Sequence, residues 1–201
     1  MARGLSYHQA SFLLPLKLLH RMQHGARDAL RAEPPVIYAV LHQSRLDPAL
    51  MLASLPDDTL HILDERASRS IWLEPWREMA RTIPFNARHV FVSRRLVRHL
   101  KGRGRLAVYF PDGIQADTKA YRLYRAVAHI AVAADARIVA ISVQGSRRSI
   151  LSFRGGGRRL MPKLRINALP ALTMKELVQN STRENATMAG ALFDRVAEAD
   201  A

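Results

Sequence analysis

Short apolar runs alternate along this chain with stretches that carry apolar residues at helical spacing. The runs predict strands at Val36–Leu41, Leu60–Leu63, His89–Val92, Leu106–Phe110, Ile138–Val143 and Leu164–Ala168. The helical patterns predict helices at Pro48–Leu55, Ser70–Ala80, Ser93–Leu100, Tyr121–Ala134 and Met174–Glu198. Strands that alternate with helices are typical of an α/β domain with a largely parallel central sheet flanked by helices.

The N-terminal segment Leu5–Met22 is rich in leucine and in basic residues. Its unbroken apolar run is far shorter than the ~20 residues that span a bilayer. Such a helix can lie in the plane of a membrane interface, or it can pack on the domain with a kink near Pro15. We predict an amphipathic membrane-surface helix over residues 1–24 and one domain over residues 25–201.

The composition supports one core and excludes cysteine chemistry. The 201 residues are 48% hydrophobic, which is enough for one sizeable domain. No cysteine is present, so disulfides, cysteinyl zinc sites and a cysteine nucleophile are excluded. We predict no metal site.

Charge narrows the class of partner. Lys and Arg number 31 against 17 Asp and Glu, a formal net charge of +14, which attracts phosphate-bearing or acidic partners. These are nucleic acid, an anionic membrane or an acidic carrier protein. No helix-turn-helix, RNP or zinc motif is present, and 6% aromatic residues leave few rings for base stacking, so we predict no nucleic-acid partner.

A histidine and an aspartate bracket the loop after the first long strand. The apolar strand Val36–Leu41 delivers His42 at its carboxyl end, where open α/β sheets bind ligands. Asp47 precedes Pro48 and an apolar run, a pattern that predicts a helix N-cap. The loop is short enough to bring the carboxylate back to the imidazole, so that His42 can take a proton from a hydroxyl. The alternative is that Asp47 is a cap alone.

A second segment, Phe110-Pro111-Asp112-Gly113, follows the strand Leu106–Phe110. A strand that ends in an acid and a glycine predicts a tight turn with exposed backbone N–H groups. Such groups can bind phosphate or stabilise an oxyanion. Taken alone, Pro-Asp-Gly is a common turn.

Together the two segments resemble the glycerolipid (PlsC-like) lysophospholipid acyltransferases. Their first motif is a histidine, four residues and an aspartate, matched by His42 and Asp47. Their third motif is Phe-Pro-Glu-Gly, matched by Phe110 to Gly113 with Asp112 in place of Glu. The chain is most similar to the acyltransferase part of the bacterial lysophosphatidylethanolamine acyltransferase/acyl-carrier-protein synthetase, including residues 121–136 and 158–170.

The resemblance implies a PlsC-like fold and a mechanism without an enzyme nucleophile. His42 would deprotonate the free hydroxyl of a lysophospholipid, which attacks an acyl thioester of acyl carrier protein or coenzyme A. No bound cofactor is implied. The candidate phosphate ligands are Arg88, Lys119 and Arg122, beside Asp112 and Gly113. The expected location is the cytoplasmic face of the inner (cell) membrane, as a peripheral protein on an anionic surface.

Three departures from the family pattern bear on the acceptor. Ile114 and Gln115 replace a common Thr-Arg pair, Arg88 is slightly displaced, and Ala140 stands where the fourth motif has proline. They favour a substituted headgroup, and hence lysophosphatidylethanolamine over lysophosphatidic acid. The alternatives are a lysophosphatidic acid acyltransferase and a non-catalytic domain that binds a membrane or nucleic acid.

Overall fold

The computed structural model describes seven ranges of the chain, and the statements below concern these. They are residues 23–24, 27–64, 82–85, 90–111, 119–149, 162–181 and 187–201. Several residues and ranges singled out in the sequence fall outside them: Leu5–Met22, Ser70–Ala80, Arg88, Asp112 and Gly113. The side chain of Lys119, the first residue of a helix, is also outside the description.

The described strands form a single sheet that is parallel except at one pair. The strands are β1 (Gln23–His24), β2 (Val36–His42), β3 (Thr59–Asp64), β4 (Thr82–Phe85), β5 (Arg105–Pro111), β6 (Arg137–Gln144) and β7 (Arg165–Ala168). Their order is β1-β7-β6-β2-β5-β3-β4, and only β6 and β7 pair antiparallel. The sheet is therefore largely parallel, as the sequence predicts.

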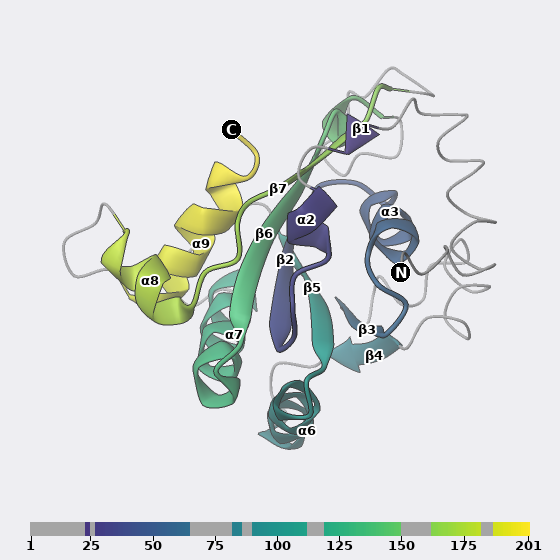
Figure 1. Ribbon diagram of the computed structural model, residues 1–201. Helices are drawn as coiled ribbons and strands as arrows, with labels where there is room; N and C mark the ends of the chain where they lie inside the picture. Colours follow the sequence, from purple (N-terminus) through teal and green to yellow (C-terminus); the bar gives the residue numbers. More distant parts are fainter. Residues whose placement is uncertain are drawn as a thin grey trace.

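Helices cover both faces of this sheet (Figure 1). They are α2 (Arg27–Leu30), α3 (Asp47–Ser54), α6 (Val90–Lys101), α7 (Lys119–Ala134), α8 (Met174–Gln179) and α9 (Met188–Glu198). One core packs α6, α7, α8 and α9 on the sheet face that carries Ile37 and Val108. The other core packs α2 and α3 on the face that carries Tyr38 and Tyr109.

Strand β2 lies at the centre of the sheet. Residues Val36 to Leu41 are all buried, and β2 pairs with β5 on one side and β6 on the other. An unbroken apolar run is what a strand buried on both faces requires. The strand that delivers His42 is thus the most enclosed one.

One predicted strand is wrong. His89–Val92 reads as a short apolar run, yet Val90–Lys101 is the helix α6. Leu96 and Leu100, four residues apart, are buried against the sheet, which is the spacing of an amphipathic helix. A run of four residues does not distinguish a strand from a helix segment.

The predicted C-terminal helix Met174–Glu198 is two helices. Thr173 and Glu176 form a capping box that begins α8, which ends at the C-cap Asn180. A second N-cap, Thr187, accepts a hydrogen bond from the Gly190 N–H and begins α9. Because a second N-cap lies within the continuous apolar pattern, that pattern forms two helices rather than one.

Two short strands were not predicted. Thr82–Phe85 is β4, at one end of the sheet order, and it contains Pro84. An edge strand tolerates a proline, because one side of it needs no ladder donor. At the other end, Gln23–His24 form β1 against β7, so the sheet begins before residue 25.

Among the helices that the structure describes, we find none whose length and hydrophobicity would let it span a bilayer.

Candidate active site

His42 is the last residue of β2 and the start of the candidate site. Side chains alternate along a strand, so His42 projects from the same face as Tyr38 and Val40, the face covered by α3. Its side chain is 17% exposed. The imidazole is therefore held by the sheet and still reachable from solvent at the carboxyl ends of the strands.

The carboxylate of Asp47 is buried beside this imidazole. Oδ2 of Asp47 lies 3.5 Å from Nδ1 of His42, and the Asp47 side chain is fully buried. The same oxygen accepts hydrogen bonds of 2.7 Å from the backbone N–H groups of Gln43 and Ser44. These two bonds fix the carboxylate, which can then stabilise a positive charge on the ring.

Asp47 is not the N-cap that the sequence predicts. The N-cap position of α3 is Leu46, with no side-chain cap hydrogen bond, and Asp47 and Pro48 are the first helical residues. The carboxylate turns back into the loop because two backbone donors of that loop need an acceptor. Its negative charge still sits favourably at the helix N-terminus.

The third motif begins next to His42. Strand β5 pairs with β2 in parallel, and Pro111 stands opposite His42 in the register. The motif residues Asp112 and Gly113 follow directly in the chain, outside the described residues. The fold thus brings the two motif segments, which the sequence separates by more than 60 residues, to one edge of the sheet.

Two buried polar side chains lie behind His42 on the same face. The ring of Tyr109 packs edge-on against His42, with centroids 5.7 Å apart. The Tyr109 hydroxyl and Nδ1 of His61 share a hydrogen bond of 2.8 Å. Burial lowers the pKa of His61 to about 4, while burial and then the Asp47 charge raise the pKa of Tyr109. Both groups are neutral at physiological pH.

The C-terminal end of the chain reaches the same loop. Nε2 of Gln43 donates to Oδ2 of Asp200 at 3.0 Å, and Arg147 donates to that oxygen at 2.7 Å. Arg147 stands in a 3₁₀ turn, Ser146–Arg148, that follows Gly145 with φ of 90°. Asp200 thus joins the residue after His42 to the turn after β6.

Of the three predicted phosphate ligands, Arg122 is the one whose side chain the structure describes. Arg122 is exposed and lines a groove between α6 and α7, on the sheet face opposite the His42 side chain. Lys119 begins α7, downstream of Pro111. The structure does not place Arg122 beside His42, and its predicted phosphate contact stays a prediction, as do those of Arg88 and Lys119.

The family model of the acyltransferases matches residues 21–144, well over half of the chain. This chain belongs to the acyltransferase family. The matched range contains His42, Asp47 and the third-motif segment.

The fold of this acyltransferase is similar to a solved one. The crystal structure of the 1-acyl-sn-glycerophosphate (LPA) acyltransferase PlsC from Thermotoga maritima matches with a TM-score of 0.60 and 14% sequence identity. The match covers 99% of this chain and 83% of that chain. It confirms the predicted PlsC-like α/β fold.

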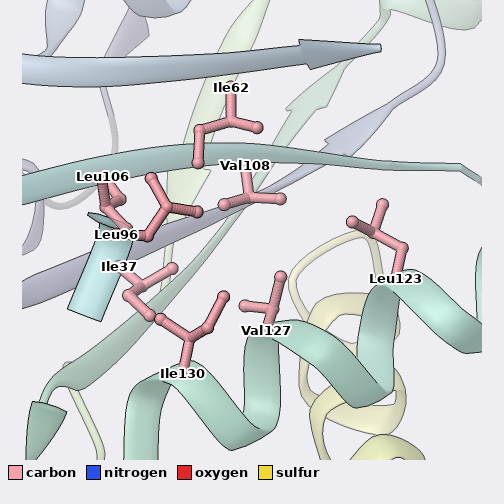
Figure 2. A pocket seen from close by; sticks show the side chains of 8 residues that line it. All are labelled: Ile37, Ile62, Leu96, Leu106, Val108, Leu123, Val127 and Ile130. Atoms are coloured by element: carbon pink, nitrogen blue, oxygen red, sulfur yellow. The ribbon is translucent and has the colours of Figure 1, made fainter. Parts of the chain in front are cut away.

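The interior of the acyltransferase holds a small void between the sheet and the α6–α7 layer (Figure 2). Its volume is about 10 Å³, and apolar side chains such as Ile37, Leu96 and Val127 line it. A void of that size is about the room that a single water molecule needs, so it cannot hold an acyl chain. Among the described residues no group of three His, Asp or Glu side chains is placed to hold a metal ion.

Sequence reasoning missed Tyr109, His61 and Asp200. The first two carried a usable signal, because in a parallel sheet residues of matching parity on adjacent strands share a face. His61 pairs with Ala107 and Tyr109 pairs with Val40, which places both on the His42 face. Asp200 had no local signal, since it is 157 residues from Gln43.

Proposed function

We propose that this acyltransferase moves a fatty acyl group from an acyl thioester to the free hydroxyl of a lysophospholipid, with His42 as general base. The observation that carries the proposal is the buried Asp47 carboxylate 3.5 Å from Nδ1 of His42, at the carboxyl edge of the sheet. Membership of the acyltransferase family supports acyl transfer as the reaction, and the histidine–aspartate pair supports His42 as its base.

The proposed reaction uses both ring nitrogens. Nδ1 faces Asp47, so Nε2 takes the proton of the lysolipid hydroxyl. The hydroxyl oxygen attacks the thioester carbonyl, the carbon–sulfur bond breaks, and the thiolate leaves with the proton that His42 held. The fixed Asp47 charge stabilises the imidazolium between these two steps. No covalent enzyme intermediate forms, which agrees with a chain that has no cysteine.

The proposed acceptor is lysophosphatidylethanolamine. A phosphodiester carries about one negative charge and a phosphomonoester up to two. This chain has Ile114 and Gln115 where related sequences often have Thr-Arg, so it offers less charge to a phosphomonoester. The second candidate is lysophosphatidic acid, the substrate named for the Thermotoga maritima protein of similar fold.

The proposed setting is the cytoplasmic face of the cell membrane, with the protein bound peripherally. The net charge of +14 supports binding to an anionic surface, and the leucine-rich segment Leu5–Met22 supplies apolar contact. The acyl donor is acyl carrier protein or coenzyme A thioester.

The test is an acceptor panel assayed with both donors, wild type against His42→Ala, read by mass spectrometry. We expect acylated lysophosphatidylethanolamine from the wild type and a loss of roughly two to four orders of magnitude in the variant. Thermal unfolding of both proteins controls for folding. Turnover by His42→Ala close to that of wild type would overturn the base assignment, and lipid binding without turnover by wild type would overturn the proposed function.

A further inference from the structure

A basic groove of about 890 Å³ runs between α6 and α7. Exposed cationic or imidazole side chains form both of its rims. They are Arg94, Arg98 and Lys101 on α6, and Arg122, Arg125 and His129 on α7. Neither helix contains an aspartate or a glutamate in its 12 and 16 residues. No described carboxylate forms an ion pair with these rims, so their charge faces solvent.

The floor of the groove is apolar. Val97 of α6 and Ala126 and Ile130 of α7 line it between the charged rims. Val97 and Ala126 are partly buried and pack against the core on the inner side of the helix layer. A groove with an apolar floor and charged rims matches an amphipathic helix of opposite charge, which inserts its apolar face and pairs its flanks with the rims.

The groove begins at the edge of the sheet that carries His42. Helix α6 follows β4 and helix α7 follows β5, so both helices start on the side where parallel strands end. Strand β5 ends at Pro111, the register partner of His42. The helices then run side by side toward the opposite edge, and a partner held between them has one end at the carboxyl edge of the sheet, on the face opposite the His42 side chain.

We propose that the α6–α7 groove docks an acidic α-helix of the protein that carries the acyl thioester, an acyl carrier protein. This inference rests on the proposed function, because it assigns the donor of that reaction. A flat anionic membrane would meet the rims and leave the apolar floor empty. A coenzyme A thioester is a small molecule, whereas the groove follows α7, a helix of 16 residues about 24 Å long that carries Arg122 and Arg125 on its rim.

The experiment reverses two rim charges that lie away from the predicted catalytic and phosphate contacts. Arg98→Glu/Arg125→Glu is compared with Arg31→Glu/Lys175→Glu, exposed positions outside the groove that give the same change in net charge. We expect the rim variant to raise the KM for a palmitoyl-acyl carrier protein by about tenfold or more, with a weaker salt dependence. The KM for palmitoyl-coenzyme A and the behaviour of the matched control should stay near wild type.

Direct binding separates this inference from the proposed function. Holo-acyl carrier protein without an acyl group is titrated by calorimetry into wild type and both variants. If no donor is turned over, the proposed function fails, while loss of carrier binding in the rim variant alone still supports the groove. Turnover of coenzyme A thioesters without binding of the carrier overturns the groove and leaves the function intact. Loss of binding to anionic vesicles with unchanged carrier binding also overturns it, and assigns the groove to the membrane.

Discussion

The side-chain amide of Gln43 donates a 3.0 Å hydrogen bond to the carboxylate of Asp200, 157 residues further along the chain. Gln43 also donates its backbone N–H to Asp47, so one carboxylate binds the backbone of Gln43 and the other binds its side chain. The Gln43–Asp200 hydrogen bond therefore connects the loop after His42 to the segment that follows α9. We therefore predict that Asp200 is a positioning residue, which acts on the candidate site through Gln43.

We expect Asp200→Ala to lower kcat by about tenfold with little change in KM for either substrate, because a misplaced base affects the chemical step more than binding. Asp200→Asn keeps an acceptor for Gln43 and should recover part of the loss. Arg147→Ala removes the ion pair with Asp200 and keeps the Gln43–Asp200 hydrogen bond, so it is the matched control. Steady-state kinetics on folded protein decides, and unchanged kcat in Asp200→Ala would show that the link is structural alone.

Asp47→Asn tests the charge next to His42. An amide oxygen can still accept from Gln43 and Ser44, but the NH₂ group then takes the buried position of Oδ1, an atom for which the structure gives no hydrogen-bond partner among the residues it describes. We expect stability to fall by about 1–3 kcal/mol and kcat to fall by roughly 10²–10⁴. The measurement is activity per folded molecule. Normal activity in the folded fraction would reduce Asp47 to a loop-fixing role.

His61 predicts a pH dependence of stability. Its pKa in the folded protein is about 4 because it is buried, against 6.5 in an unfolded chain. Between these values the unfolded state binds one more proton, so stability falls as the pH drops from 6.5 toward 4. Between pH 7 and pH 4.5 the loss is about 2 to 3 kcal/mol.

The matched variant for this prediction is His61→Gln, which cannot titrate and can still bond the Tyr109 hydroxyl. Urea unfolding at pH 7 and pH 4.5 should show that the variant loses less free energy of unfolding than the wild type, by about 2 to 3 kcal/mol. All other titrating groups are shared, so they cancel in the comparison. Equal losses in the two proteins would mean that His61 takes up its proton in the folded state as easily as in the unfolded one.

The predicted membrane segment is tested by a deletion that spares the sheet. Removing residues 1–22 leaves Gln23–His24, which form β1 against β7. We expect weaker binding to anionic vesicles, since Arg3, Lys17 and Arg21 are lost with the leucines. Each basic residue near such a surface contributes about 1 kcal/mol, and salt screens the effect. Unchanged binding by the folded truncation would place the membrane contact elsewhere, for example in the basic stretch between Arg147 and Arg165.

Local signals account for the parts that were predicted correctly. The apolar strands and the histidine–aspartate spacing lie within a few residues of one another, so the sheet and the His42–Asp47 proximity could be read from the chain. The cap of α3 could not be read in this way. Which residue caps depends on where the Asp47 carboxylate finds its donors, and those are the loop amides of Gln43 and Ser44.

Features that depend on tertiary packing were beyond the sequence. The amphipathic patterns predict α6 and α7 separately, but only the sheet order brings Arg98 and Arg125 to opposite rims of one groove. In the same way, strand alternation can suggest that His61 and Tyr109 share a face, but their hydrogen bond needs the register between β3 and β5. A run such as His89–Val92 has no local property that decides between strand and helix.

The central place of β2 has a consequence for synthesis. Its first residue, Val36, pairs with Arg105 and Arg137, so the nearer partner strand is 69 residues downstream. At a translation rate of about 5–20 residues per second, roughly 3 to 14 s pass between the synthesis of Val36 and that of Arg105. During that interval the nascent chain carries its most apolar strand without either sheet neighbour, a state in which chaperones bind and aggregation begins. A nascent chain that stops before β5 would therefore contain His42, the proposed base, without either of the strands that flank β2 in the folded sheet.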